Sequence, residues 1–286
     1  MIKITVENSK GKQLCLTDDE NKYQLESVLG LNPPSADIAM SDNIEDGADF
    51  VHSRIGTRNI VINLVIKGYV EENRLALYKY FPNKENVKLY FETNTKKVWI
   101  DGYVESNEPD QFSMLTTCQI SILCPNPFFK DLEETLINMN IIAPKFYFPF
   151  YTVTPRPFSI YSQISILNLI NEGNVSSGMT IEISARGEVI NPTIYNRDTK
   201  EYIGVGTAER PFIMMKGDTI LITTHINNKR VKLIRNAVET NIFNYLKKGS
   251  KFLQLETGDN VFTYSAESGN EYIDIDFKYY SNYEGI

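Results

Sequence analysis

The sequence has few of the residues that metal centres and hydrolytic active sites require. Its 286 residues include three cysteines, two histidines and one tryptophan. A zinc site needs about four Cys or His ligands at clustered spacings, or three ligands and a water, and the sequence offers no such cluster. His52 and His225 lie outside any motif, such as G-x-S-x-G, that places a base beside a nucleophile. We therefore expect no metal, no cofactor and no catalytic residue.

Long hydrophobic runs are also missing. No apolar stretch reaches the roughly 20 residues of a membrane-spanning helix, and the opening MIKITVENSKGKQ has the pattern of an amphipathic strand rather than of a secretion signal. These features predict a chain that is made in the cytoplasm and does not contact a membrane. The cysteines are odd in number, and Cys118 and Cys124 lie on one predicted strand, too far apart to bridge each other. We expect buried free thiols.

Basic residues are fewer than acidic residues in the first half of the chain. The net charge is −7, and residues 1–143 carry 14 Lys and Arg against 21 Asp and Glu, whereas residues 144–286 carry 15 of each sign. Proteins that grip a phosphate backbone do so with clustered Lys and Arg. The first half is therefore not expected to bind DNA, although it could surround a passing polyanion.

One basic cluster lies in the second half and could bind nucleic acid or an acidic protein face. Because only Phe243 and Tyr245 are nearby to stack on bases, protein contact is favoured over nucleic acid. An ordinary solvated face is favoured over both. The cluster consists of Lys229, Arg230, Lys232, Arg235, Lys247, Lys248 and Lys251.

Period-two alternation of apolar residues is the main signal of the first part and predicts a sheet. A short helix is predicted over residues 71–81, where Leu75, Tyr78 and Phe81 recur at spacings of three and Pro82 ends the pattern. The predicted strands form a hairpin over 3–16, a long strand from 58, a hairpin that turns at 93–96, and a strand over 112–124.

The segment 30–57 is long, polar and marked by proline and glycine, with little periodicity. A connection of this length inside a domain is typically an arm or a binding loop. Its apolar residues suggest that it packs on something. They are Ile38, Met40, Ile44, Phe50 and Val51.

The stretch QISILCPNPFF ends an alternating strand abruptly. Proline cannot donate to a strand ladder, so Pro125 and Pro127 are expected to release the chain from the sheet. Phe128 and Phe129 then either cap a core or dock on a neighbour. Residues 130–160 combine prolines with many aromatic residues, which favours a packed crossover over a loose tether.

The second part reads as short strands separated by turn signals at intervals of roughly 8–12 residues, the spacing typical of a β-sandwich. TNIFNYLK is at most one or two helical turns. We place two domains at 1–143 and 144–286 in a mainly β protein.

Two patterns in this second part have a possible chemical meaning. Asp274 and Asp276 project from one face of a predicted strand and could flank a sugar or bind calcium, but alternation with Ile273, Ile275 and Phe277 favours a plain polar outer face. GNVSSGMT mimics a phosphate-binding loop in its glycine spacing, yet Met179 stands where the lysine is needed and a strand follows.

The stretch GYVESNEPDQFSMLTTCQISILCPNPFF resembles a signature of the distal tail proteins of long-tailed bacteriophages. In that family a strand ends in Cys-Pro-(Asp/Asn)-Pro-(Phe/Tyr)-Phe after a hairpin with a G.V...E pattern. The resemblance continues, in order, through RNIVINLVIKG, LYKYF, GEVINPTIYNRDTKEYI, GDTILITT, SKFLQLETGDNVFTY and YYSNYEGI. It therefore spans nearly the whole chain.

The resemblance implies a structural protein of the virion that is assembled in the host cytoplasm and is not an enzyme. The N-terminal domain would be a β-sandwich with one helix and an extended arm that embraces a neighbouring subunit in a homohexameric ring. The C-terminal domain would be a galectin-like β-sandwich to which receptor-binding or baseplate proteins attach. The tail tube protein would lie above the ring and the tail-tip hub below, with DNA passing through the channel without specific binding.

Three hypotheses follow from these observations. The first is the hexameric adaptor, the second a carbohydrate-binding sandwich that contacts the host cell surface, and the third an enzyme such as a glycosidase. No sugar-binding set can be placed residue by residue, and Trp99 lies in the first domain. We favour the adaptor, with subunit or partner docking assigned to Ile38, Met40, Phe50, Phe128 and Phe129.

Overall fold

The computed structural model describes residues 2–18, 22–43, 46–112, 115–144, 159–163 and 166–286. The chain forms two compact units, one of Met1–Leu132 with Asn282–Ile286 and one of Glu133–Ser281. The division therefore falls at 132/133, whereas the sequence pattern placed it at 143/144, and residues 282–286 return to the first unit. No helix in this described part is long and apolar enough to cross a membrane.

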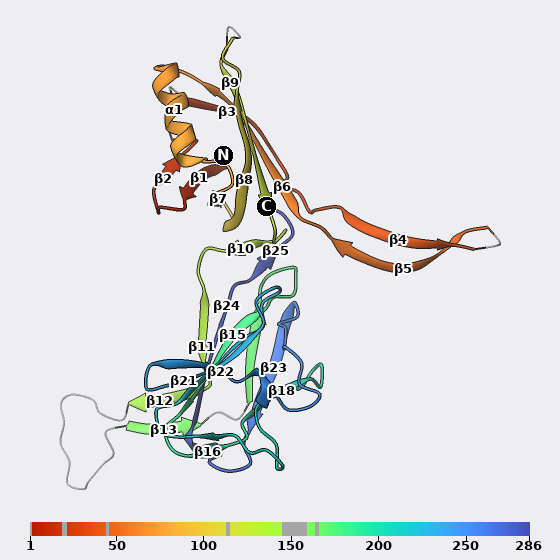
Figure 1. Ribbon diagram of the computed structural model, residues 1–286, viewed down its shortest axis with the longest axis vertical. Helices are drawn as coiled ribbons and strands as arrows, with labels where there is room; N and C mark the ends of the chain where they lie inside the picture. The colour runs from red at the N-terminus through yellow and green to blue at the C-terminus, as the bar shows by residue number, and fades with distance from the viewer. Residues whose placement is uncertain (1, 19–21, 44–45, 113–114, 145–158, 164–165) are drawn as a thin grey trace. The chain divides into compact units, whose positions relative to one another are not determined.

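The first unit is built on one antiparallel sheet with the strand order β2-β1-β7-β8-β9-β6-β3 (Figure 1). Ile60, Ile62 and Leu64 point into the core, while Asn59 and Asn63 lie on the other face, as their alternation predicted. The strands are β1 (Lys3–Asn8), β2 (Gln13–Cys15), β3 (Tyr23–Leu29), β6 (Arg58–Ile66), β7 (Asn86–Glu92), β8 (Lys97–Pro109), β9 (Thr117–Cys124), β10 (Phe129–Asp131) and β25 (Asn282–Tyr283).

The helix α1 (Val70–Tyr80) packs on this sheet. The Asn8 carboxamide donates to the Lys79 carbonyl at 3.0 Å and the Tyr23 hydroxyl to the Asn73 carbonyl at 2.9 Å, which ties the helix to β1 and β3. The predicted apolar stripe is wrong in one position, because Leu75 is 46% exposed and Leu77 is buried instead, together with Phe81. A spacing of four keeps two residues on one helical face, whereas repeated spacings of three drift around the helix.

The prolines after β9 shift the chain along the sheet instead of releasing it. Strand β9 ends at Cys124, as predicted, and pairs with Tyr103–Pro109 of β8. After Pro125 and Pro127 the chain returns as β10, whose Lys130 and Asp131 pair with Trp99 and Val98 on the same edge of β8. Strand β25 then pairs with β10, so residues 282–283 belong to this sheet.

Two sequence expectations concern segments at the margin of the described residues. The strand expected over 112–124 begins only at Thr117, and residues 113–114 lie outside the described residues. In the expected crossover, β12 (Asn140–Pro144) pairs with β13 (Ser159–Gln163), and residues 145–158 between them also lie outside.

The second unit is a β-sandwich of a six-stranded sheet, β11-β24-β15-β20-β21-β22, and a four-stranded sheet, β14-β23-β17-β18. Phe262 of one sheet meets Phe277 of the other with ring centroids 5.4 Å apart in a shared apolar core. In TNIFNYLK the first two residues end β22, and the helical part is the 3-10 turn η1 (Phe243–Tyr245). The strands are β11 (Thr135–Asn138), β14 (Ile166–Asn171), β15 (Met179–Ala185), β16 (Val189–Ile190), β17 (Thr193–Asn196), β18 (Tyr202–Gly204), β19 (Ile213–Met214), β20 (Thr219–Thr223), β21 (Arg230–Arg235), β22 (Val238–Asn241), β23 (Gly258–Ser265) and β24 (Ile273–Tyr279), with a second 3-10 turn η2 (Asn270–Tyr272).

Candidate functional site

The segment expected to be an unpatterned loop is a β-hairpin, which we call the arm. Its strands are β4 (Ala36–Asp42) and β5 (Ala48–Ile55), paired antiparallel from Ala36↔Ile55 to Asp42↔Ala48. The register shifts between Ala39 and Met40, where Val51 is the extra residue of a bulge. The hairpin pairs with no other strand among the described residues and extends from the sheet of the first unit (Figure 1).

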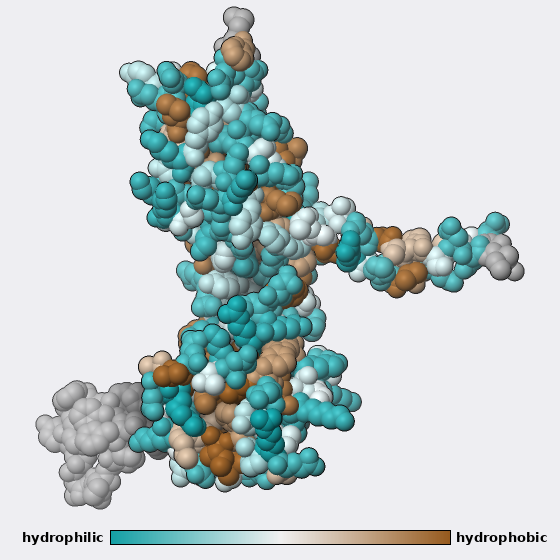
Figure 2. Space-filling model, viewed as in Figure 1, coloured by the Kyte–Doolittle hydropathy of each residue, from teal (hydrophilic) through white to brown (hydrophobic). Residues whose placement is uncertain are grey.

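One face of the arm carries three of the predicted docking residues. Met40 lies directly opposite Phe50, and Ile38 lies two residues away on the same strand, so the three side chains share a face. They are 57–64% exposed (Ile38 57%, Met40 61%, Phe50 64%). Figure 2 shows apolar surface alternating with polar surface along the arm. Ile44 lies outside the described residues. Exposed apolar surface of this kind is typical of interaction sites, and the docking role of these residues stays a prediction.

Charged side chains lie on both faces of the arm. Asp37, Asp42 and Asp49 lie on the two strands, and Arg54 forms an exposed ion pair with Asp37 at 3.4 Å. Such a pair contributes little to stability because water screens both charges. Of the three carboxylates, only that of Asp42 shares the apolar face, because Asp37 and Asp49 alternate with its residues.

The chain turns into the arm at Gly30. Its φ of +85° lies in the left-handed region that glycine adopts readily. A Cβ at this position would lie 2.2 Å from the Asn59 carbonyl oxygen, so a larger residue would push β3 away from β6. We call residues 30–35 and 56–58, which connect the arm to β3 and β6, the arm root.

Arg58 occupies the centre of the arm root with its side chain almost wholly buried. Its Nε donates to the Pro127 carbonyl at 2.5 Å, and its Nη1 donates to the carbonyls of Gly30 and of Asn32, the latter at 2.8 Å. Its Nη2 donates to the Glu284 carbonyl. Burial lowers the pKa of Arg58 from its ordinary value, while nearby Cys124 and Glu284 oppose that change.

The two aromatic residues after the proline break have different environments. Phe129 is wholly buried, packs edge-on against Phe91 with ring centroids 5.6 Å apart, and lies under the Arg58 guanidinium at 4.6 Å. Of the two alternatives left by the sequence, Phe129 thus caps a core and is not exposed for docking. Phe128 is half-buried, and its docking role stays a prediction.

The acidic pair of the second unit is occupied by neighbouring side chains. Arg186 forms an ion pair with Asp274 at 3.0 Å, and the Asn138 carboxamide donates to Asp276 at 2.6 Å. Both carboxylates lie on the outer face of β24, whose other face is buried. The described residues contain no group of three or more His, Cys, Asp or Glu side chains that could hold a metal ion.

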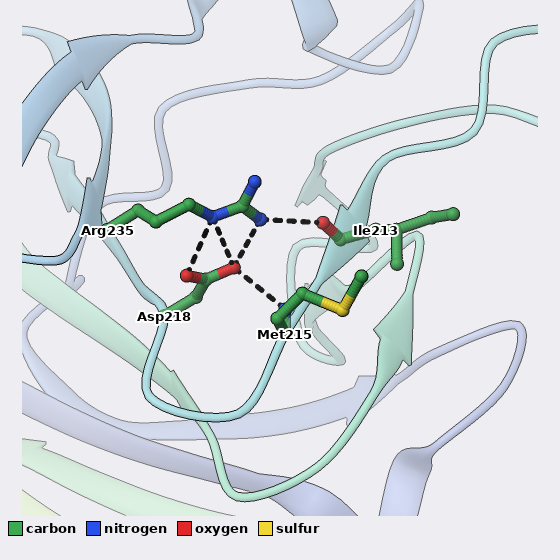
Figure 3. A network of polar contacts seen from close by, with 4 residues as sticks. All are labelled: Ile213, Met215, Asp218 and Arg235. Carbon is green, nitrogen blue, oxygen red and sulfur yellow. Dashed lines mark hydrogen bonds and ion pairs between the residues drawn. The ribbon is translucent and has the colours of Figure 1, made fainter.

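Three of the seven side chains of the basic cluster form ion pairs with carboxylates, and two others lie over aromatic rings. Arg235 pairs with Asp218, and Figure 3 shows how that carboxylate also accepts from the Met215 amide. Lys232 pairs with Glu239 at 2.5 Å. Two further lysines lie over aromatic rings, Lys229 over Phe252 and Lys247 over Tyr202, and Lys251 pairs with Glu201 at 2.6 Å. This arrangement fits the solvated face that the sequence favoured.

Three solved structures share this fold. The crystal structure of SPP1 Dit (gp 19.1), described as a paradigm of the hub adsorption apparatus in phages that infect Gram-positive hosts, matches with a TM-score of 0.65 and 12% identity, over 96% of this chain and 98% of that one. Chains of the phage P2 baseplate in its activated conformation match with TM-scores of 0.53 with Ca and 0.54 with Sr, at 13% and 14% identity, each over 97% of this chain and 98% of the other. A search of curated proteins found no match.

Two family models match the sequence, one for each unit. Residues 13–124 match the phage tail protein RIFT-related domain, and residues 172–282 match the C-terminal domain of the siphovirus-type tail component. The first range covers most of the first unit, and the second lies almost wholly within the sandwich of the second unit. The two domains therefore occur in one chain in the order that the tail signature implied, and the chain belongs to the distal tail protein family of siphovirus-type phage tails.

Proposed function

We propose that this protein is the hexameric adaptor of a phage tail tip, joining the tail tube to the tail-tip hub. In this proposal six first units form the ring, and the second units anchor receptor-binding or baseplate proteins. The family places the protein among structural tail components, which are parts of the virion. The ring, its number of subunits and its partners are the proposed part.

The exposed apolar face of the arm is the observation that carries the proposal. Ile38, Met40 and Phe50 each lose contact with water only if another surface covers them, because the arm packs on no other strand among the described residues. Covering exposed apolar area contributes about 25 cal/mol per Å². A neighbouring copy of the chain is the proposed cover, and a closed ring gives every arm an acceptor of the same kind.

The charge of the first unit supports passage of DNA through the ring. Residues 1–132 and 282–286 carry six more acidic than basic side chains, 20 against 14. Like charge on the wall of a channel opposes condensation of the phosphate backbone on it. DNA would then cross the ring without specific binding.

The test is the mass of the assembled particle. We expect mass photometry and negative-stain images of the purified chain to show hexameric rings, and the triple variant Ile38→Ser, Met40→Ser, Phe50→Ser to remain folded by circular dichroism but to stay monomeric. A matched control replaces three exposed apolar residues of the second unit, Met215→Ser, Ile226→Ser and Val238→Ser, and should keep the rings.

Two outcomes would count against the proposal in different ways. Rings that persist in the arm variant would show that the arm does not hold them together. A wild-type chain that stays monomeric even when mixed with the tube and hub proteins of the same phage would refute the ring itself.

A further inference from the structure

Arg58 is a buried cation that is hydrogen-bonded to main-chain carbonyl oxygens, and the nearby Glu284 carboxylate also favours its charged form. A buried charge is costly unless it is fully hydrogen-bonded, and here main-chain carbonyl oxygens take that role. Four carbonyls accept from one guanidinium, whose planar arrangement of donors suits several acceptors in fixed directions. The Phe129 ring covers the guanidinium at 4.6 Å and adds a cation–π contact.

The four carbonyls come from three segments that are far apart in the chain. Gly30 and Asn32 belong to the arm root, Pro127 to the break after β9, and Glu284 to the segment that returns from the second unit. Glu284 is 226 residues from Arg58 in sequence. A contact with a carbonyl fixes the path of the backbone and does not depend on which side chain that residue carries.

The returning segment lies directly against the arm root. The Ile286 amide donates to the Leu31 carbonyl at 3.2 Å. A Cβ on Gly285 would approach the Pro33 ring to 2.9 Å and the Leu31 carbonyl to 3.0 Å, so only glycine fits there without movement. Tyr283 pairs with Phe129 in the sheet. Residues 283–286 therefore form one wall of the arm root.

We infer that Arg58 is a positioning residue that sets the direction in which the arm leaves the first unit, and that residues 284–286 complete its binding site. The arm is attached by two short links, and without a fixed root it would sample many directions. Restricting the arm to one direction on assembly would cost free energy, and a pre-organised arm avoids that cost. This inference rests on the proposed docking function of the arm.

The test measures the distance between the arm and the β7–β8 turn within single chains. Nitroxide labels are placed at Ser41→Cys on β4 and Thr95→Cys in the β7–β8 turn, in a Cys15→Ser background, and labelled chains are diluted with unlabelled ones so that pulsed electron resonance reports distances within one chain. Cys118 and Cys124 are buried and stay unlabelled. We expect a narrow distance distribution in the parent, and a width that increases at least about two-fold in Arg58→Met, in Arg58→Lys and on deletion of 284–286.

Two controls distinguish a role of Arg58 in positioning the arm from a general destabilisation of the first unit. Arg74→Met removes a surface arginine that also lies over an aromatic ring, that of Tyr78, and should leave the width unchanged. Glu284→Ala removes the side chain but keeps the carbonyl that Arg58 contacts, so it should also leave the width unchanged. An unchanged width in Glu284→Ala would show that the deletion of 284–286 does not act through the lost charge of the Glu284 carboxylate. If Arg58→Met does not fold, the deletion and Glu284→Ala still decide the question.

The same samples distinguish this inference from the proposed function. An unchanged width in Arg58→Met and in the deletion would overturn the positioning role, whether or not rings form. A broadening that Arg74→Met shares would also overturn it. A broadened arm with rings intact by mass photometry would support the positioning role and show that ring formation does not require a pre-organised arm.

Discussion

The guanidinium of Arg235 holds the carboxylate of Asp218 through two nitrogens, with Nε 2.9 Å from Oδ1 and Nη2 2.5 Å from Oδ2 (Figure 3). The Asp218 side chain is only 4% exposed, whereas that of Arg235 is 45% exposed. The Met215 amide donates to Oδ2 at 2.7 Å and closes the turn before β20. The pair thus connects β21 to this turn at one end of the sandwich.

The pair predicts an acid-sensitive contribution to stability. The hydrogen bonds from Arg235 lower the pKa of Asp218 most, burial acts in the opposite direction, and the Met215 amide adds to the lowering. A carboxyl whose pKa is lowered in the folded state stabilises that state at pH values above its pKa in the unfolded chain, about 3.9. This contribution is lost as the pH falls through the lowered pKa of the folded state. We expect Asp218→Asn to lower the free energy of unfolding by about 2 kcal/mol at pH 7, and the gap to narrow below about pH 4.

Thermal and urea unfolding of the full chain, followed by circular dichroism between pH 7 and pH 2.5, measure this gap. Lys251→Gln is the matched control, because Lys251 is 66% exposed in its ion pair with Glu201, and the pair should contribute less than about 0.5 kcal/mol. A gap for Asp218→Asn that stays constant down to pH 2.5 would contradict the assignment.

Phe129 and Phe128 are adjacent in sequence, but substitutions should affect stability very differently. Phe129→Ala removes a wholly buried ring and should cost about 3–5 kcal/mol of unfolding free energy in the first unit. Phe128→Ala alters a half-buried ring and should cost about 1 kcal/mol. Fluorescence of Trp99, the only tryptophan and a residue of β8, reports unfolding of this unit. Equal losses for the two variants would show that the burial difference does not hold in solution.

The sheet strands were predictable because burial of one face imposes a period of two. Ile60, Ile62 and Leu64 alternate in the sequence and are buried in the structure, since a single shift would turn all three toward water. The same reasoning predicted the hairpins of β1 with β2 and of β7 with β8. It predicted the sandwich of the second unit from the spacing of its turns.

Alternation of apolar residues could not predict the arm or its root. The arm buries neither face, so nothing in its sequence enforces alternation, and the bulge at Val51 interrupts what alternation there is. The exposed apolar residues Ile38, Met40 and Phe50 were nonetheless noted because they are unusual in a polar segment. Arg58 gave no signal, because its acceptors are carbonyl groups, which every residue has, and one of them lies 226 residues away.

The three cysteines should differ in reactivity. Burial is the main cause that raises the pKa of Cys118 and of Cys124, each to about 12, so almost no thiolate is present in either near pH 8. Cys15 is only partly buried. We expect a disulfide reagent at pH 8 to label one thiol per folded chain and three after denaturation, and Cys15→Ser to leave none that reacts in the folded state. Rapid labelling of two or three thiols in the native chain would mean that the core of the first unit opens, since both buried cysteines of β9 belong to that core.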